Sequence, residues 1–203
     1  MKILAIGWNY PQHNAELSAT TPKEPVVFLK PDSSLLKNGK PFFIPDFSEE
    51  IEYETELVLR INRLGKHIAP KFASRYYDAI GLGIDFTARD LQRRQKEAGL
   101  PWEICKAFDS SAAIGDFLPL SSFNDLNNIS FRLDKNGTTV QQGNSSQMIF
   151  NFDQIVSYVS RFFTLKIGDL IFTGTPAGVG KVEINDLLEG YIEDKKMFSF
   201  RIK

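Results

Sequence analysis

The chain has 203 residues, of which 42% are hydrophobic and 24% are charged, and its 17 Phe can fill a core. This composition is typical of a folded globular protein and excludes extensive disorder, and the length fits one catalytic domain over residues 1–203. The formal net charge of −1 leaves no overall field to attract a phosphate backbone, so we expect no nucleic-acid partner.

Cysteine and histidine are scarce in this chain. One cysteine, Cys105, excludes an intrachain disulfide, as is usual in a reducing compartment. No stretch approaches the roughly 20 apolar residues that cross a bilayer, and the apolar start lacks a signal-peptide cleavage pattern. We therefore expect a cytoplasmic protein that binds no membrane. With only His13 and His67 available, any metal site is expected to use oxygen ligands.

The N-terminal pattern predicts a strand at residues 2–6 and then a short helix that begins near Pro11. His13 and Glu16 lie three apart on that helix, so the carboxylate can accept a hydrogen bond from the imidazole and fix its tautomer. An exposed surface pair is the alternative. The next predicted strand ends at Lys30, which is either an edge charge or a partner for a phosphate or carboxylate group.

Alternating residues between Ile51 and Ile61 predict a strand with an acidic face. Glu52, Glu54 and Glu56 occupy even positions, and most of the odd positions are apolar. Three like charges on one face repel one another unless water or a cation intervenes. A solvated sheet face satisfies this condition, and so does a site for a hard cation such as Mg²⁺, which prefers carboxylate oxygens.

A second acidic position follows further along the chain. Residues 73–80 have helix-like composition, and a short strand then ends at Asp85. Thr87 is expected to cap a helix over residues 88–98. A carboxylate at this position can cap that helix or face a ligand, and both interpretations of Asp85 stay open.

The helix over residues 88–98 places Arg89 and Gln92 on one face. The aperiodic stretch after it, residues 99–109, is predicted to be a packed loop. Cys105 in this loop is either a buried spectator thiol or a nucleophile that needs a nearby base.

The C-terminal half is rich in predicted strands. Residues 115–128 are expected to form a loop, and a hairpin follows at residues 129–142. Helical spacing predicts an amphipathic helix over residues 149–163. A glycine-rich loop follows and contains Thr175. Its hydroxyl either stabilises a turn of this loop or donates a hydrogen bond to a ligand. Irregularly placed helices among many strands indicate an α+β, β-dominated fold.

Six segments, taken in order, resemble the fumarylacetoacetate hydrolase family over nearly the whole chain. They are Gly-Trp-Asn-Tyr-Pro-Gln-His-Asn-Ala-Glu (7–16), Phe-Leu-Lys-Pro (28–31), Tyr-Glu-Thr-Glu-Leu (53–57), Asp-Phe-Thr-Ala-Arg-Asp-Leu-Gln (85–92), Lys-Ala-Phe-Asp (106–109) and the glycine-rich run at 168–180. Residues 24–31 and 100–106 are most similar to the acylpyruvase branch, which includes oxaloacetate decarboxylases. The family usually has arginine at the position of Trp8.

The resemblance implies a mixed β-sandwich roll with peripheral helices and a homodimer. It implies Mg²⁺ or Mn²⁺ held by Glu54, Glu56 and Asp85, and a His13–Glu16 dyad that activates water with help from Lys106. The substrate contacts that it implies come from Lys30, Arg89, Gln92 and Thr175.

The activity that we expect from this resemblance is hydrolysis of a carbon–carbon bond in an acylpyruvate-like 1,3-diketo acid, with release of pyruvate. Two alternatives within the enzyme class are oxaloacetate decarboxylation and isomerisation of a hydroxymuconate-type dienol, which need no nucleophilic water. A third alternative is a catalytically silent protein that binds a small keto acid.

Overall fold

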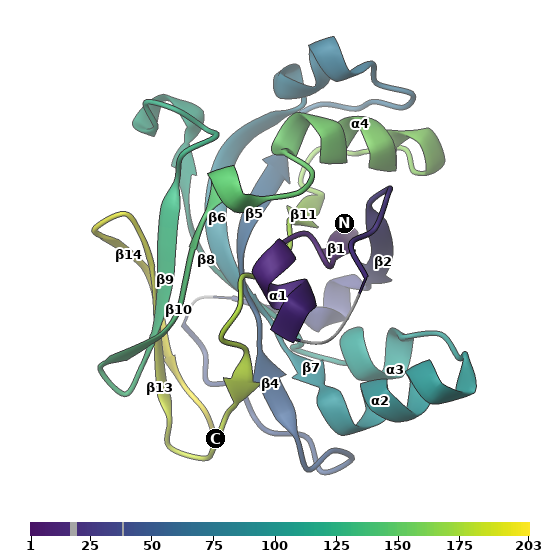
Figure 1. Ribbon diagram of the computed structural model, residues 1–203. Coiled ribbons are helices and arrows are strands. Elements are labelled where there is room, and N and C mark those ends of the chain that lie inside the picture. The colour runs from purple at the N-terminus through teal and green to yellow at the C-terminus, as the bar shows by residue number, and fades with distance from the viewer. Residues whose placement is uncertain (17–19, 38) are drawn as a thin grey trace.

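Strands dominate the computed structural model, which describes residues 1–16, 20–37 and 39–203 (Figure 1). The largest sheet has seven strands. In spatial order the strands are β2 (Val26–Lys30), β1 (Ile3–Gly7), β11 (Leu170–Phe172), β5 (Thr55–Ile61), β6 (Tyr77–Asp85), β8 (Ala112–Pro119) and β3 (Leu35–Leu36). The strand β1 pairs in parallel with β11, and β3 pairs in parallel with β8, whereas the other pairs are antiparallel.

Two smaller sheets complete the β-structure. One has the order β10 (Thr138–Asn144), β9 (Ser130–Lys135), β13 (Leu187–Ile192) and β14 (Lys195–Arg201). The other has the order β12 (Gly180–Lys181), β4 (Ile51–Tyr53) and β7 (Thr87–Ala88). The predicted α+β, β-dominated architecture is confirmed.

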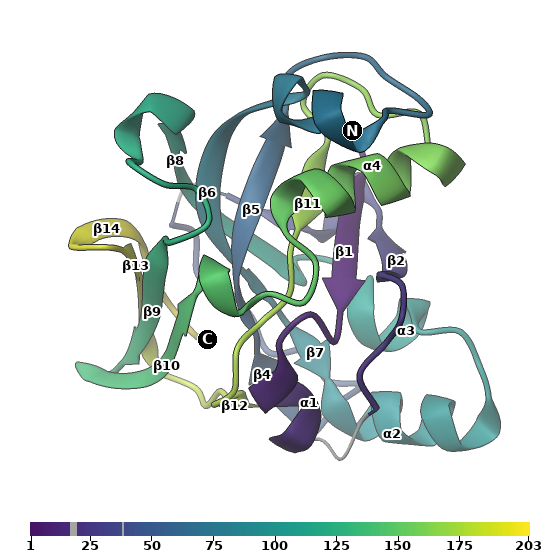
Figure 2. The same cartoon turned by 45° about the horizontal axis from the view of Figure 1, so that its top comes forward.

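Helices cover the outside of the sheets. The α-helices are α1 (Pro11–Glu16), α2 (Arg89–Ala98), α3 (Glu103–Lys106) and α4 (Phe152–Phe162). Short 3-10 turns are η1 (Asp32–Ser34), η2 (Pro70–Arg75), η3 (Leu120–Ser122) and η4 (Ser145–Gln147). Figures 1 and 2 show the sheet of β9, β10, β13 and β14 on one side of the molecule and α2 and α3 on the other. Among the described residues, no helix is long and apolar enough to cross a bilayer.

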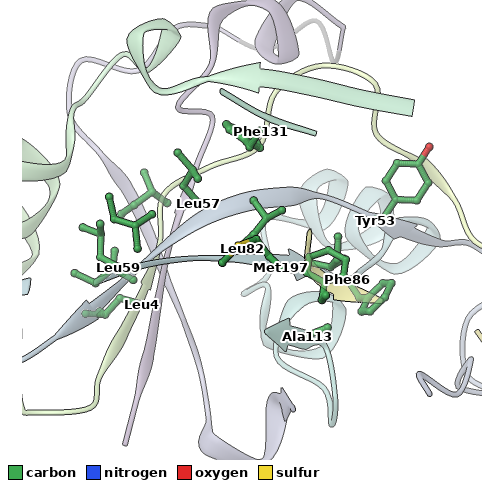
Figure 3. Close-up of a cluster of buried hydrophobic side chains, with 14 of the residues drawn as sticks. Leu4, Tyr53, Leu57, Leu59, Leu82, Phe86, Ala113, Phe131 and Met197 are labelled. Atoms are coloured by element: carbon green, nitrogen blue, oxygen red, sulfur yellow. The ribbon is translucent and has the colours of Figure 1, made fainter. Parts of the chain in front are cut away.

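The main hydrophobic core lies between the large sheet and the four-stranded sheet. Figure 3 shows side chains from β1, β5, β6, β9 and β14 meeting there. Phe86, which directly follows β6, stacks on Phe42 with ring centroids 3.9 Å apart, and both rings are fully buried. Burial of one such aromatic side chain contributes about 1.5–3 kcal/mol. The core therefore holds the end of β6, where Asp85 lies, in a fixed position.

The structure corrects the predicted secondary structure at three places. Residues 99–109 are not all loop, because Glu103–Lys106 form α3. Residues 73–80 do not form one helix, because η2 ends at Arg75 and the central strand β6 begins at Tyr77. Glycine within β6 weakens the strand pattern, yet the fold needs it: a Cβ at Gly83 would lie 2.7 Å from the Ala113 carbonyl oxygen. The predicted loop at 115–128 is also wrong over its first part, where β8 continues to Pro119.

Two other predictions are confirmed. The helix expected over residues 149–163 is α4, and Asn151 begins it with a capping box in which Gln154 takes part. The expected hairpin joins β9 to β10 through Asn136 and Gly137, whose φ angles are 54° and 81°. Positive φ at both turn residues is typical of a type I′ hairpin.

Asp186, which directly precedes β13, joins the C-terminal hairpin to the β9–β10 turn. Its carboxylate accepts hydrogen bonds from the backbone N–H of Glu183 (2.8 Å) and the Asn136 amide (2.7 Å), and Lys135 Nζ lies 3.5 Å away. Burial raises the pKa of Asp186, but these hydrogen bonds and the lysine charge outweigh burial and lower it overall. The charged form of the Asp186 carboxylate is therefore more stable in the folded protein than in the unfolded chain.

Replacing Asp186 by Asn is expected to lower the free energy of unfolding at pH 7 by roughly 1–3 kcal/mol. Because the pKa of Asp186 is lower in the folded state, its contribution is present above the unfolded pKa of about 4 and is lost as pH falls through the folded value. Denaturant titrations of both proteins between pH 7 and pH 3 measure this difference. A difference in stability that stays constant down to pH 3 would contradict the assignment.

Candidate metal centre and active site

Three buried carboxylates meet where β4, β5 and β6 adjoin. Glu54 lies at the break between β4 and β5, Glu56 lies on β5, and Asp85 ends β6. The antiparallel pairing of β5 with β6 aligns these positions, and the Asp85 N–H donates to the Glu54 carbonyl at 2.8 Å. One oxygen from each carboxylate lies within 4.8 Å of the others. The sequence prediction that these three side chains converge therefore agrees with their position in the structure.

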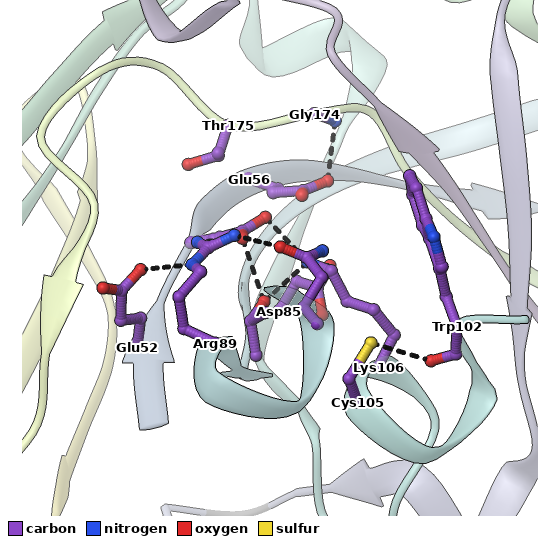
Figure 4. Close-up of polar contacts among 12 residues, drawn as sticks. Glu52, Glu56, Asp85, Arg89, Trp102, Cys105, Lys106, Gly174 and Thr175 are labelled. Atoms are coloured by element: carbon purple, nitrogen blue, oxygen red, sulfur yellow. Dashed lines mark hydrogen bonds and ion pairs between the residues drawn. The ribbon is translucent and has the colours of Figure 1, made fainter. Parts of the chain in front are cut away.

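Lys106 at the end of α3 holds two of these carboxylates (Figure 4). Its Nζ donates to Glu54 Oε2 at 2.9 Å, to Asp85 Oδ2 at 2.8 Å and to Thr87 Oγ1 at 2.6 Å. Thr87 in turn donates to Glu54 Oε1 at 2.9 Å. The predicted capping role of Thr87 is wrong, because Ala88 is the residue at the helix N-terminus and no side chain caps it.

Lys30 lies behind Asp85, away from the open side of the site. Its side chain is fully buried, and Nζ lies 2.6 Å from Asp85 Oδ1. Its hydrogen bonds go to the carbonyl oxygen of Lys106 and to the backbone and side chain of Ser111. Lys30 is not among the residues that line the pocket. Lys30 thus has a carboxylate partner, one of its two interpretations from the sequence, and this partner is Asp85 of the protein, whereas the family resemblance implies a substrate contact.

Arg89 binds the outer side of the carboxylate cluster. Its guanidinium donates to Glu52 at 2.6 Å, to Glu54 at 2.7 Å and to the Gln92 side-chain oxygen at 2.6 Å. Glu52 thus pairs with arginine outside the three-carboxylate set, in keeping with its exclusion from the expected ligands. Arg89 and Gln92, which the sequence predicts to share a helical face, do so at the start of α2.

The charges around the cluster set opposite pKa directions for its two glutamates. Burial raises the pKa of Glu54, but Lys106 and Arg89 outweigh burial and hold it well below its usual range. The pKa of Glu56 is raised well above its usual value by burial and by the negative charges of Asp85 and Glu54. Its one hydrogen bond among the described residues comes from the Gly174 N–H at 2.6 Å. Glu56 is therefore the carboxylate that would gain most from a cation.

The donor set fits a hard divalent cation. All three groups are carboxylates, and Mg²⁺ and Mn²⁺ favour oxygen ligands. Of the three, Glu56 accepts a single side-chain hydrogen bond among the described residues, from the Gly174 N–H, and no lysine or arginine pairs with it there. A bound cation would satisfy the remaining lone pairs of this buried carboxylate.

His13 and Glu16 form a pair on α1 at the edge of the same pocket. His13 Nδ1 lies 3.2 Å from Glu16 Oε2, His13 is 4% exposed, and the Glu16 side chain is 36% exposed. His13 is thus buried, unlike the exposed surface pair considered from the sequence. With Nδ1 facing the carboxylate, the other ring nitrogen is available for proton transfer.

The pocket joins the dyad to the acidic cluster. Its lining includes every sequence-predicted site residue except Glu16 and Lys30, and Glu16 contacts it through His13. Thr175 is 3% exposed, donates to the Thr55 carbonyl at 3.0 Å and accepts from Gln141 at 2.9 Å. The further lining residues, which the sequence analysis did not select, are Ile6, Gly7, Trp8, Phe28, Lys96 and Trp102.

Cys105 agrees with its interpretation as a spectator. Its thiol donates to the Trp102 carbonyl at 3.1 Å, and burial raises its pKa to about 11. The thiol therefore stays protonated at neutral pH, whereas a cysteine nucleophile reacts as the thiolate.

Gly174 places its N–H on Glu56 through a backbone conformation that favours glycine. Its φ is 103°, and an added Cβ would lie 2.7 Å from the Asn9 Cβ. Replacing Gly174 by Ala is expected to destabilise the protein by about 1–3 kcal/mol, from backbone strain, and to weaken Mn²⁺ binding as the loop shifts. Thermal unfolding and Mn²⁺ titration measure the two effects.

Gly168→Ala is the matched control for this prediction. Gly168 has φ 86°, but nothing lies within 4 Å of an added Cβ. The Gly168→Ala variant should lose stability through backbone strain alone, and its Mn²⁺ affinity should be unchanged. Equal Mn²⁺ affinities in both variants would contradict a role of Gly174 in positioning Glu56.

The family model for the fumarylacetoacetate (FAA) hydrolase C-terminal domain matches residues 2–201. The chain belongs to the fumarylacetoacetate hydrolase family. This confirms the resemblance drawn from the six segments, and with it the family fold that the resemblance implies.

Three relatives within the family bear on its chemistry. Oxaloacetate decarboxylase, mitochondrial, of Dictyostelium discoideum is 41% identical over 93% of this chain and 87% of the relative. Oxaloacetate tautomerase FAHD1, mitochondrial, of Mus musculus is 38% identical over 99% and 91%. The crystal structure of fumarylpyruvate hydrolase from Pseudomonas aeruginosa in complex with Mn²⁺ and pyruvate has a TM-score of 0.94 and 36% identity, and the match covers 100% of this chain and 89% of that one.

The two curated relatives are named for reactions of oxaloacetate, and the solved structure is that of a fumarylpyruvate hydrolase. They favour the oxaloacetate alternative of the sequence analysis over acylpyruvate hydrolysis, its first choice. The Mn²⁺ in the Pseudomonas relative agrees with the fit of the three carboxylates to a divalent cation.

Proposed function

We propose that the protein is a Mg²⁺- or Mn²⁺-dependent enzyme that tautomerises oxaloacetate between its enol and keto forms. The observation that carries this proposal is one pocket that contains three clustered carboxylates and a buried histidine oriented by glutamate. The oxaloacetate tautomerases among the relatives support the choice of substrate.

Glu54, Glu56 and Asp85 would hold the cation. When bound, a divalent cation supplies positive charge to the 2-oxo and carboxylate oxygens of a keto acid and so favours its enolate. Lys106, which already binds Glu54 and Asp85, adds a second positive charge beside this position. Arg89 and Gln92 line the same pocket and orient the substrate.

His13 is the group placed to move the proton. Tautomerisation transfers one proton between the enol oxygen and C3, consumes no water and breaks no carbon–carbon bond. Because Nδ1 of His13 faces Glu16, its other ring nitrogen takes the proton from one of these two sites and returns it to the other, and the carboxylate stabilises the charged imidazole in between. The same imidazole would activate water in the hydrolytic reaction expected from the sequence.

Decarboxylation of oxaloacetate is the second candidate, and the Dictyostelium decarboxylase relative favours it. It also proceeds through an enolate, but C3–C4 cleavage releases CO₂ and leaves the electron pair on the enolate. Hydrolysis of acylpyruvates is supported by the similarity to fumarylpyruvate hydrolase. All three reactions would use the same carboxylate cluster and the same keto-acid end of the substrate, and they differ in which bond breaks.

Three assays on the purified protein separate the candidates. They follow loss of the oxaloacetate enol absorbance, CO₂ release from oxaloacetate, and pyruvate release from an acylpyruvate, each with Mg²⁺, with Mn²⁺ and with a chelator. We expect enol loss to be the fastest reaction and to fall in chelator to the rate measured without protein. Faster release of CO₂ or faster acylpyruvate cleavage would replace tautomerisation as the main activity.

A further inference from the structure

The outer end of the pocket is formed by aromatic rings and one lysine. The rings of Trp8 and Trp102 pack edge to face with centroids 5.3 Å apart, and Phe28 contacts Trp102 at 5.9 Å. Lys96 Nζ lies 5.2 Å from the Trp8 ring centroid and 5.6 Å from that of Trp102. Lys96 is exposed overall, and these cation–π contacts favour a position of its ammonium group beside the pocket.

The elements on either side fix this arrangement. Trp8 directly follows β1 with φ 59°, a conformation that a bulky residue rarely adopts, and its carbonyl accepts a hydrogen bond from Asn14 at 3.0 Å. Lys96 lies four residues after Gln92 and seven after Arg89, so the three side chains share one face of α2. That face runs from the acidic cluster outwards along the pocket.

Lys96 differs from the other cations of the pocket in its partners. Lys106 is bound to Glu54 and Asp85, and Arg89 is bound to two glutamates. The ammonium group of Lys96 forms no ion pair or hydrogen bond within residues 1–16, 20–37 and 39–203, and its contacts there are with the two tryptophan rings. It lines both the inner pocket and the open cleft outside it. A positive charge therefore stands at the pocket mouth, and no carboxylate of the described residues forms an ion pair with it, although Glu16, Glu52 and Glu97 line the same cleft.

We propose that Lys96, held between Trp8 and Trp102, binds the distal carboxylate of a 2-oxo dicarboxylate whose keto-acid end lies at the three carboxylates. This inference rests on the proposed function and names the residue that selects a dicarboxylate over a monocarboxylate. The aromatic rings exclude water from one side of the ion pair, which strengthens it relative to a fully solvated pair.

The ion pair also bears on which reaction follows. Decarboxylation breaks the C3–C4 bond, moves its electron pair towards C3 and turns the charged carboxylate into neutral CO₂. A lysine paired with that carboxylate stabilises the charged ground state and loses its partner as CO₂ forms, so it slows this reaction. Tautomerisation leaves the distal carboxylate charged throughout. Lys96 therefore favours proton transfer over loss of CO₂.

Calorimetric titration of the Mn²⁺-loaded protein tests the subsite without turnover. The probes are 2-oxobutyrate and 2-oxoglutarate, which share the keto-acid end and differ in the distal carboxylate. Lys96→Met is expected to weaken 2-oxoglutarate binding by about 10-fold, the range of one charge-assisted hydrogen bond, and to leave 2-oxobutyrate within about twofold. In turnover assays, this variant should raise the ratio of CO₂ release to enol loss.

Arg94→Met is the matched control. This substitution also removes one positive charge from α2, but Arg94 does not line the pocket. It should leave both affinities unchanged. Equal weakening of both probes by Lys96→Met, no weakening of either, or the same loss in Arg94→Met would overturn the subsite. If the unmodified protein shows the Lys96-dependent preference but turns over no oxaloacetate, the proposed function fails and the dicarboxylate subsite stands.

Discussion

Replacing His13 by Ala is expected to lower kcat for oxaloacetate tautomerisation by roughly 10²–10⁴-fold, the usual contribution of a general acid–base group. Mn²⁺ affinity should stay within about twofold, because His13 lies outside the carboxylate set. Stopped-flow measurement of enol loss and calorimetric Mn²⁺ titration measure the two quantities separately. The result expected is loss of turnover in a protein that still binds its metal.

The Glu16→Gln variant tests whether the Glu16 carboxylate orients the His13 imidazole. The amide keeps the size of the side chain and removes the charge that faces Nδ1. It should lower kcat less than His13→Ala does and change the pH dependence of kcat, since the imidazolium loses its stabilising anion. Turnover in His13→Ala equal to that of the unmodified protein would remove the imidazole from the mechanism.

Replacing Asp85 by Asn is expected to destabilise the chelator-treated protein by about 3–5 kcal/mol, the usual cost of leaving a buried charge without its partner. The Lys30 side chain is fully buried and Asp85 is its only carboxylate partner among the described residues. Lys106 loses one of its two carboxylates as well. Denaturant titration measures the loss, and the same variant should bind Mn²⁺ much more weakly.

A double-mutant cycle shows whether Lys30 causes this loss. Lys30→Met removes the second charge, so Lys30→Met/Asp85→Asn should be more stable than the sum of the single changes predicts. Additive effects would mean that the buried pair does not couple, and the destabilisation would then belong to Lys106 or to local packing. The comparison is made in chelator so that metal binding does not contribute.

The acidic site was the part of the molecule most accessible from sequence. Alternation around Glu54 and Glu56 is a local pattern, and Asp85 stands where a strand gives way to a helix. Both signals depend on near neighbours. Their approach in space followed from the family resemblance, and the structure agrees because β5 and β6 pair in the register that aligns them.

Other features depend on distant contacts and were not accessible. The composition of residues 77–80 favours a helix, but their place between β5 and β8 makes them a central strand. The Thr87 hydroxyl donates a hydrogen bond to Glu54 and accepts one from Lys106, and it does not cap the helix that follows. Lys96 looks like one of several solvated charges on α2, and only the two tryptophans from other segments distinguish it.

Asn9 connects segments from opposite ends of the chain. Its side chain bonds to the backbone of Phe150 and to the Thr173 carbonyl, and β1 beside it pairs with β11. Asn9, which lies just before the helix that carries His13, is thus held by residues that are synthesised 141 and 164 positions later. A nascent chain cannot form the complete catalytic site early in synthesis, and contacts of such long range make folding comparatively slow.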